Sequence, residues 1–410
     1  MGNQLVFHLM RVVKSIWFRP AAYALAALAA ILFTPVLAGL VPESWAGTVN
    51  LESVETTLNI LASSMLAVAI FALATMFSAF QAAAQAATPR ARPLMTQDRT
   101  AQGAISTFVG AFLFSLLGLI GLTTNLYNDA EILILFVLSL LLVAIVVATL
   151  ISWIQRLTGF GGVEEAILSI EDATRAALNH AARRPALGAK PAEKPAKNST
   201  PVPAGRPGYV QSIDIAKLAR LANDYDVRIF IDAQPGRYVG PGRPLAYVTG
   251  KADELADQIR DTFVTAQRRT FEADPRFGLI ALSEIASRAL SPAVNDPGTA
   301  ISVLAAIGRL FCGYAAAARG ETETPLDGVL ARPLDPEDLV RDAFRAIARD
   351  GAGHVEVGIR LQKTLAMLAS ADGDIFTGLA KDMARDALER SNAALTSESD
   401  RAALKSAASA

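Results

Sequence analysis

Residues 56–87 read TTLNILASSMLAVAIFALATMFSAFQAAAQAA, and this apolar stretch without a charged residue decides the class of the protein. A helix of about 20 mostly apolar residues crosses the hydrocarbon core of a bilayer, where the backbone polar groups must bond internally. Three other uncharged apolar stretches lie at 21–41, 103–126 and 132–154. The sequence therefore predicts an α-helical membrane domain of four transmembrane helices, covering residues 1–156.

The basic residues around these stretches all lie on one predicted side of the membrane. Lys and Arg are enriched in cytoplasmic flanks of transmembrane helices. Here they occur before the first stretch, between the second and third, and after the fourth, whereas the other two connections carry only acidic charges. Both termini are therefore predicted to be cytoplasmic. The basic residues that carry this prediction are Arg11, Lys14, Arg19, Arg90, Arg92, Arg99 and Arg156.

A cleaved secretory signal peptide is the alternative interpretation of residues 1–46, which combine a basic start with an apolar stretch. That stretch is long for a signal peptide, and three further spans follow it. Cys312 is the sole cysteine, so an internal disulfide is excluded, in agreement with a cytoplasmic soluble part.

Span two carries polar and small side chains at heptad spacing along one stripe. Two interpretations stay open: the stripe lines a water-filled path in an oligomer, or it packs helices closely together, which is the simpler interpretation. The stretch is also long, about 48 Å against a hydrocarbon core of about 30 Å, so we expect its glutamine-bearing end to project into the cytoplasm. The candidate pore or packing stripe comprises Thr57, Ser64, Phe71, Ser78, Gln81 and Gln85.

Span three repeats a small residue every fourth position, from Gly103 through Thr107 and Ala111 to Ser115. Such a ridge is first of all a packing face between helices. The four spans also lack the ionisable residues that pumps and proton-coupled carriers place inside the membrane. Active transport is therefore not expected.

The remainder of the chain is predicted to be soluble and cytoplasmic. An amphipathic helix over 163–182 and a Pro/Lys-rich linker make up residues 157–207. Strand-like alternation then predicts a small α+β module over 208–270, including a helix over 253–266. A helical domain over 271–395 and a disordered tail over 396–410 complete the predicted fold.

The turn after the apolar helix predicted over 277–290 is the main candidate for a ligand site in the soluble part. Its polar groups precede the next helix, whose N-terminus favours anions. The alternative is a structural hairpin, in which Asp296 caps that helix. The candidate ligand or structural hairpin comprises Arg288, Ser291, Asn295 and Asp296.

Motifs for catalysis, metals and cofactors are absent from the sequence. His8, His180 and His354 stand alone, without partners at ligand spacing, so no metal site and no cofactor is expected. A formal net charge of −1 with scattered basic residues gives no nucleic-acid footprint. The sequence therefore predicts that the protein is not an enzyme and binds no nucleic acid.

Several segments together resemble a known bacterial family of predicted membrane proteins, called domain of unknown function twenty-two fifty-four. The most specific segment is 274–300, with its Ser-Pro-x-x-Asn-Asp-Pro core; Val294 stands where the family pattern has Ile. The resemblance implies four spans in a bacterial inner membrane and a cytoplasmic domain, and it supplies no catalytic residues. The other segments that carry it are 58–89, 208–214 and 236–245.

Two hypotheses follow for the function. In the first, the protein forms a homo-oligomer through spans two and three, with a passive channel-like pore and a cytoplasmic regulatory domain. In the second, the spans only anchor a scaffold or ligand sensor in the lipid bilayer, and the cytoplasmic part binds a protein or small molecule that the sequence does not identify. An enzyme with an unrecognisable site is a third and weaker alternative.

Overall fold

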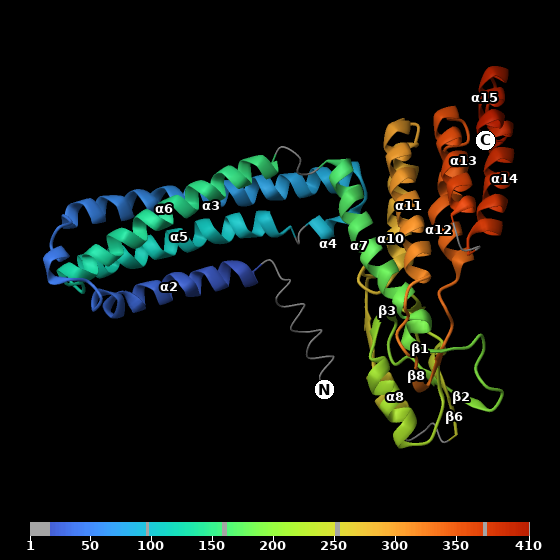
Figure 1. The fold of residues 1–410 in the computed structure, drawn as a ribbon, viewed down its shortest axis with the longest axis horizontal. Coiled ribbons are helices and arrows are strands. Elements are labelled where there is room, and N and C mark those ends of the chain that lie inside the picture. Colours follow the sequence, from blue (N-terminus) through green and yellow to red (C-terminus); the bar gives the residue numbers. More distant parts are fainter. Residues whose placement is uncertain (1–16, 96–97, 158–161, 251–254, 372–374, 410) are drawn as a thin grey trace. The chain divides into compact units, whose positions relative to one another are not determined.

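The computed structural model contains two compact units, Met1–Glu165 and Ala166–Ala410. Figure 1 shows the elements of both units in sequence colours, and each unit is described by itself. The basic residues Arg11 and Lys14, used above for the orientation, lie outside the described residues. The structure describes residues 17–95, 98–157, 162–250, 255–371 and 375–409.

Four long helices make up most of the described part of the first unit, and α5 is at their centre. Helix α5 packs against each of the other three, and it is the most extensively buried of the four. The side chains of Leu58, Phe114 and Leu135 meet in the core of the unit. The long helices are α2 (Phe18–Ala38), α3 (Leu51–Ala86), α5 (Arg99–Thr123) and α6 (Asp129–Leu157), with the short η1 (Glu43–Trp45), η2 (Pro89–Ala91) and α4 (Arg92–Met95) between them.

Small residues of α5 allow its neighbours to approach closely. A Cβ atom at Gly118 would lie 3.1 Å from a methyl group of Leu58 and 3.4 Å from one of Leu135. One at Gly110 would lie 3.3 Å from the Cβ of Tyr23. Within the predicted ridge of span three, Thr107, Ala111 and Ser115 are buried inside the unit. The ridge therefore packs helices of one chain, as small residues do in membrane proteins.

Five described helices are long and apolar enough to cross a membrane, one more than predicted. The additional one is α11 (Pro297–Ala318) in the second unit. It packs there against α10 and α13, and its Arg309 forms an ion pair with the buried Glu171. The apolar character of α11 is therefore consistent with a helix packed among other helices of the second unit.

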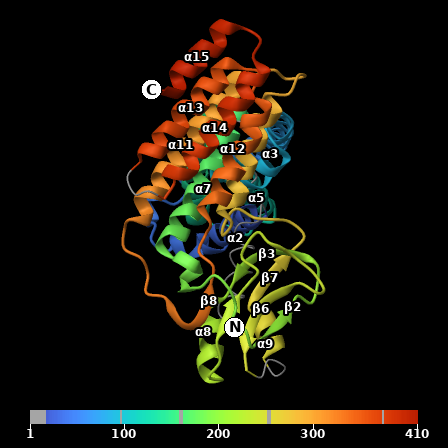
Figure 2. The ribbon, with the colours of Figure 1, turned by 90° about the vertical axis from the view of Figure 1, so that its right-hand side faces the viewer.

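Two sheets lie at one end of the second unit and a layer of helices at the other (Figure 2). The five-stranded sheet has the order β1-β8-β4-β6-β2. Strands β1, β8 and β4 are parallel to one another, β6 is antiparallel to β4, and β2 is antiparallel to β6. A second sheet has the order β5-β3-β7. The strands are β1 (Ala189–Pro191), β2 (Ser199–Pro203), β3 (Gly208–Ile213), β4 (Ile229–Ile231), β5 (Tyr238–Val239), β6 (Pro244–Thr249), β7 (Phe263–Ala266) and β8 (Leu326–Ala331).

The helices of the second unit pack around buried aromatic rings. Phe311 lies 4.9 Å from Phe376 and 5.5 Å from Phe344, measured between ring centroids. Helix α8 instead packs against β8 of the five-stranded sheet. The helices are α7 (Val163–Arg183), η3 (Pro185–Gly188), α8 (Ile215–Asp224), α9 (Ala256–Arg260), α10 (Pro275–Ala289), α11, α12 (Pro336–Asp350), α13 (Val355–Ser370), α14 (Thr377–Ala394) and α15 (Glu398–Ser409).

Helix starts were largely predictable from their capping residues. Asp214, Asp296 and Asp335 each accept a backbone N–H at the start of α8, α11 and α12. Each therefore satisfies one of the donors that a helix start leaves unpaired.

Three predicted segments need correction. The predicted linker contains β1 and β2; Val202 is buried there, and β2 tolerates its prolines because it is an edge strand. The predicted disordered tail forms α15, because its fully buried Leu404 packs on Gly358 of α13. The predicted helix over 253–266 ends at Arg260, and β7 follows it to pair with β3.

The predicted boundary between the α+β module (208–270) and the helical domain (271–395) is also wrong. Strand β8 belongs by sequence to the predicted helical domain, yet it pairs with both β1 and β4. Pairing of this kind joins segments a hundred or more residues apart, which a local pattern does not reveal.

Candidate functional site

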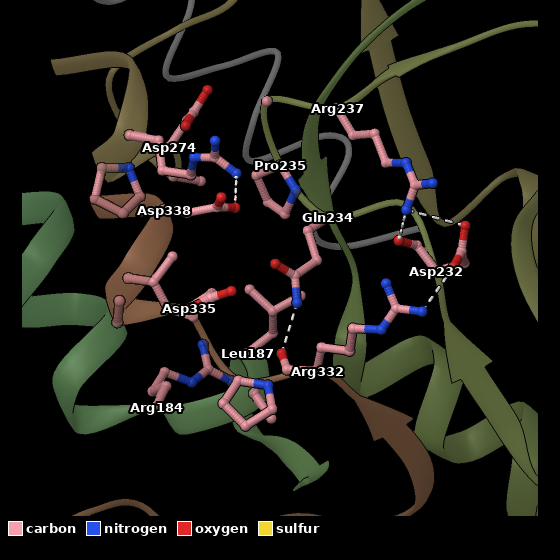
Figure 3. A pocket seen from close by; sticks show the side chains of 18 of the residues that line it. Arg184, Leu187, Asp232, Gln234, Pro235, Arg237, Asp274, Arg332, Asp335 and Asp338 are labelled. Carbon is pink, nitrogen blue, oxygen red and sulfur yellow. Dashed lines mark hydrogen bonds and ion pairs between the residues drawn. The ribbon is translucent and has the colours of Figure 1, made fainter. Parts of the chain in front are cut away.

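A pocket of about 450 Å³ lies at the carboxyl ends of the parallel strands β4 and β8. Open sheets of this type place their ligand sites at the carboxyl ends of the strands. Residues that line the pocket come from four segments, which surround it in Figure 3. These segments are the end of α7 with η3, the loop 232–237 after β4, the stretch 269–276 that leads into α10, and the stretch 332–338 that leads into α12.

Asp232, the first residue after β4, organises the sheet side of the pocket. Its carboxylate lies 3.1 Å from Nη1 of Arg237 and 3.9 Å from Nη2 of Arg332. Arg332, which directly follows β8, also stacks over the ring of Phe230 and donates from Nε to the carbonyl of Glu193. The two guanidinium groups are thus fixed with one carboxylate between them.

Asp274 organises the wall formed by the start of α10. It caps that helix by accepting the N–H of Phe277, and it holds Arg269 through two bonds, Nε–Oδ2 at 2.7 Å and Nη2–Oδ1 at 2.9 Å. Burial raises the pKa of Asp274, an effect that the nearby Arg269 opposes. Gly236 fits against this carboxylate only because it lacks a side chain, since a Cβ there would lie 2.1 Å from Oδ2.

The start of α12 supplies a further charged pair. Arg276 of α10 contacts Asp338 and donates from Nε to Asp342 at 2.7 Å, which joins the first turns of the two helices. Asp335 caps α12 and lies at the pocket, as Figure 3 shows. Two capped helix starts therefore open onto the same cavity.

Arg184 reaches the pocket from the end of α7. Its Nε lies 3.0 Å from a carboxylate oxygen of Glu323, but the geometry is not that of a hydrogen bond, and this buried Nε has no other hydrogen-bond partner in the described part of the chain. Glu323 itself is 60% exposed, so water weakens the attraction. Arg184 and Arg332, which is 3.9 Å from its carboxylate, are therefore the two arginines of the pocket that are least committed to a protein carboxylate.

The backbone next to Arg184 is strained. Ala186 and Leu187 both line the pocket and adopt left-handed conformations, with φ of 50° and 65°. Left-handed backbone is uncommon for residues other than glycine, and strain of this kind concentrates at functional sites. The chain turns sharply here and then enters β1.

The composition of the lining decides which chemistry the pocket offers. Five arginines and four aspartates line it: Arg184, Arg237, Arg269, Arg276, Arg332, Asp232, Asp274, Asp335 and Asp338. Arginine presents planar donors that match carboxylate and phosphate groups. Among the described residues, no cluster of histidine, cysteine and acidic side chains has the arrangement of a metal site.

The predicted hairpin lies at the other end of α10, about 22 Å along the helix from the pocket. Its polar groups bond within the turn. Ser291 donates to the carbonyl of Arg288, Asn295 has a φ of 50°, and Asp296 accepts both the N–H and the hydroxyl of Thr299. These bonds to Thr299 lower the pKa of Asp296. The geometry is that of a capped turn.

The predicted stripe of α3 runs along the edge of its packed face. Thr57 and Ser64 are partly buried and donate to carbonyls of their own helix, at Ser53 and Ile60. Phe71, Ser78, Gln81 and Gln85 are exposed on the isolated chain. The face that packs against the other helices carries Leu58, Leu61, Met65, Ala69, Ala72 and Met76 instead.

Sequence inspection missed most of the residues of the pocket. Arg269 and Asp274 lie in the stretch quoted for the resemblance or just before it, but Arg184, Asp232 and Arg332 are far apart in the chain. One signal was present, because Asp274-Pro275 and Asp335-Pro336 repeat the same cap-and-proline start. The parallel pairing of β4 with β8 brings Asp232 beside Arg332, and the pairing of β1 with β8 brings the segment that contains Arg184 to the same sheet.

Comparison with known proteins places the chain in a family. The profile described as "Predicted membrane protein (DUF2254)" matches residues 13–367. The chain belongs to this family. The resemblance noted from the sequence is thereby confirmed, and the family description agrees with the apolar helices of the first unit.

Individual relatives are similar over a shorter stretch. The "Uncharacterized protein Rv1290c" of Mycobacterium tuberculosis is 30% identical over 156 residues, which is 36% of this chain. The "Uncharacterized protein Mb1321c" of Mycobacterium bovis matches to the same extent. The matched region spans 27% of each of these relatives. No solved structure shows significant similarity to the chain.

Proposed function

We propose that this protein is a membrane-anchored sensor that binds a small organic anion in the arginine-lined pocket. One observation carries the proposal: five arginines from four separate segments converge on a cavity at the carboxyl ends of parallel strands. The cavity volume of about 450 Å³ suits a metabolite-sized ligand. The ligand class is a phosphate or carboxylate compound.

The pairing of the arginines, rather than the overall charge, favours an anion over a purely structural ion-pair network. Arg269 and Arg276 each have a close aspartate partner, whereas Arg237 and Arg332 share Asp232. Arg184 contacts only the exposed Glu323 among the described acidic groups. An anion between Arg184 and Arg332 would complete their bonding, and it would account for the strained backbone that leads away from Arg184.

Binding without catalysis is the simplest use of this site. The described lining holds arginines, aspartates, one amide and apolar groups, and its four aspartates are engaged as helix caps or as partners of arginines. A non-enzymatic role also agrees with the absence of catalytic motifs from the sequence. The aspartates of the lining would select ligands that carry hydroxyl or amino groups beside the anionic group.

The membrane part of the proposal assigns α2, α3, α5 and α6 as the spans of a bacterial inner-membrane protein. Helix α11 is left out because its Arg309 pairs with the buried Glu171 among soluble helices. The basic flanks favour cytoplasmic termini. In a Cys312→Ser background, an impermeant thiol reagent should label Ser44→Cys from outside the cell but not Ser199→Cys; the reverse pattern would contradict this orientation.

Thermal unfolding of the full chain in detergent tests the binding proposal. We expect inorganic phosphate, succinate or adenosine monophosphate to raise Tm by about 2 °C or more at saturation, whereas neutral adenosine should not. The Arg184→Ala/Arg332→Ala variant should lose this stabilisation, because the two least committed guanidinium groups are gone.

A matched control separates binding from general charge effects. Arg385 is 77% exposed on α14 and pairs only with Asp382 among the described residues, so Arg385→Ala should keep the full ligand response. The response of each variant is measured against its own Tm without ligand, because Arg332 also contacts Phe230 and the carbonyl of Glu193. Equal stabilisation of both variants by the probe anions would place binding elsewhere and refute the proposal.

A passive pore in a homo-oligomer is a second candidate, favoured by α3. This helix has 36 residues, about 54 Å, and Ser78, Gln81 and Gln85 are exposed along it. A pore requires a closed ring of subunits. Native mass spectrometry of the protein released from detergent should then show three or more chains; a monomer or dimer would exclude the pore and leave the sensor proposal untouched.

A further inference from the structure

A second hollow, apart from the pocket, lies where α12 packs against α14. Its volume is about 390 Å³, and six residues line it: Arg341, Asp342, Arg345, Ala346, Arg349 and Arg390. Three of its arginines recur every fourth residue, so they share one face of α12. The fourth comes from α14 and closes the hollow from the other side.

Each arginine except Arg345 is held by an acidic group of its own helix or next to it. Arg341 contacts Asp338, Arg349 donates to the adjacent Asp350 at 2.6 Å, and Arg390 donates to Asp386 at 2.8 Å. These contacts use only part of the five donors of a guanidinium group. They therefore fix the direction of each side chain and leave donors for a further acceptor.

The acidic residue of the lining does not balance this charge. Asp342 already accepts Nε of Arg276 at 2.7 Å, so it serves the neighbouring helix α10. Arg345 is exposed and shows no acidic partner among the described side chains. The hollow consequently holds more guanidinium groups than its surrounding carboxylates occupy.

Arg349 of α12 and Arg390 of α14 line the same hollow. The hydrogen bond to Asp386 is the main cause that raises the pKa of Arg390, Glu389 raises it as well, and Arg349 opposes the rise. An anion between the two guanidinium groups would reduce their mutual repulsion. A phosphate group accepts several such charge-assisted hydrogen bonds at once.

We propose that this hollow between α12 and α14 binds a phosphate group through Arg345, Arg349 and Arg390. The bound group is either a free phosphate compound or the headgroup of an anionic phospholipid, since both present the same oxygens. This site is separate from the arginine-lined pocket at the ends of β4 and β8, called the sensor pocket below. The proposal does not depend on that pocket, because the two cavities share no lining residue.

Two measurements on the full chain in detergent test the site and separate the two sources. Calorimetry measures the affinity for inorganic pyrophosphate, and native mass spectrometry counts retained phosphatidylglycerol against phosphatidylcholine. The test variant is Arg345→Ala/Arg349→Ala. It should bind pyrophosphate at least about tenfold more weakly, or lose its preference for phosphatidylglycerol, because two charge-assisted contacts are removed.

Controls distinguish the site from other cationic surfaces. Both measurements are made in an Arg184→Ala/Arg332→Ala background, which removes the sensor pocket as a second phosphate site. In this background Arg385→Ala on α14 should leave the affected measurement unchanged, and Arg345→Lys/Arg349→Lys should retain most of the binding. Loss of pyrophosphate affinity supports a free phosphate compound, whereas loss of phosphatidylglycerol retention alone supports a lipid. Absence of both forms of binding from the wild type, or equal binding by the test variant, would overturn the proposal.

Discussion

At the scale of single residues, the sensor pocket depends on the fit between Gly236 and Asp274. The glycine has a φ of 86°, and the space for its missing side chain is filled by the carboxylate that holds Arg269. The role of Asp274 as the cap of α10 could be predicted from the sequence, because an aspartate before a proline is a local signal for a helix start. The contact with Gly236 was not, because it joins two loops that are 38 residues apart.

Substitution of Gly236 by alanine should therefore damage both stability and anion binding. We expect a left-handed alanine to cost about 1–2 kcal/mol of unfolding free energy, and displacement of Asp274 from Arg269 should add to this. Gly242→Ala provides the control, because its φ is 83° but its Cβ would have nothing within 4 Å. Equal destabilisation of the two variants in denaturant unfolding would show that the contact with Asp274 contributes nothing.

At the scale of elements, helix α7 crosses α10 where Gly278 faces Thr174. A Cβ at Gly278 would lie 1.8 Å from the Thr174 hydroxyl oxygen, so the side chain of Thr174 fits here only because Gly278 has none. The two helices themselves were predictable from their apolar periodicity, and so were the four apolar helices of the first unit. Their crossing point was not, nor were the short strands β1 and β8, whose pairing is non-local.

Replacing a glycine by alanine should have opposite effects on stability in α10 and in α11. Gly278→Ala is expected to destabilise the second unit by about 1–3 kcal/mol through overpacking. Gly313→Ala in α11 meets nothing within 4 Å and should stabilise the protein by up to about 1 kcal/mol, since alanine favours helix. Denaturant midpoints measure both changes; a stabilising Gly278→Ala would contradict the close crossing.

At the scale of the whole molecule, the chain combines a unit of long apolar helices with a unit that carries a polar cavity. The membrane character was evident from the sequence, because a run of uncharged residues is a strong and local signal. The cavity was not, because its five arginines come from separate segments. This difference explains why the leading hypothesis from the sequence concerned the spans, whereas the proposal made from the structure concerns the cavity.

Isothermal titration of the full chain in detergent tests the central claim most directly. The probe is whichever of phosphate, succinate or adenosine monophosphate stabilises the wild type most. In an Arg345→Ala/Arg349→Ala background, which removes the second proposed phosphate site, we predict saturable binding of one anion per chain with or without Arg385→Ala, and at least about tenfold weaker binding with Arg184→Ala. The absence of saturable heat from all three anions, or an unchanged affinity in Arg184→Ala, would contradict the account.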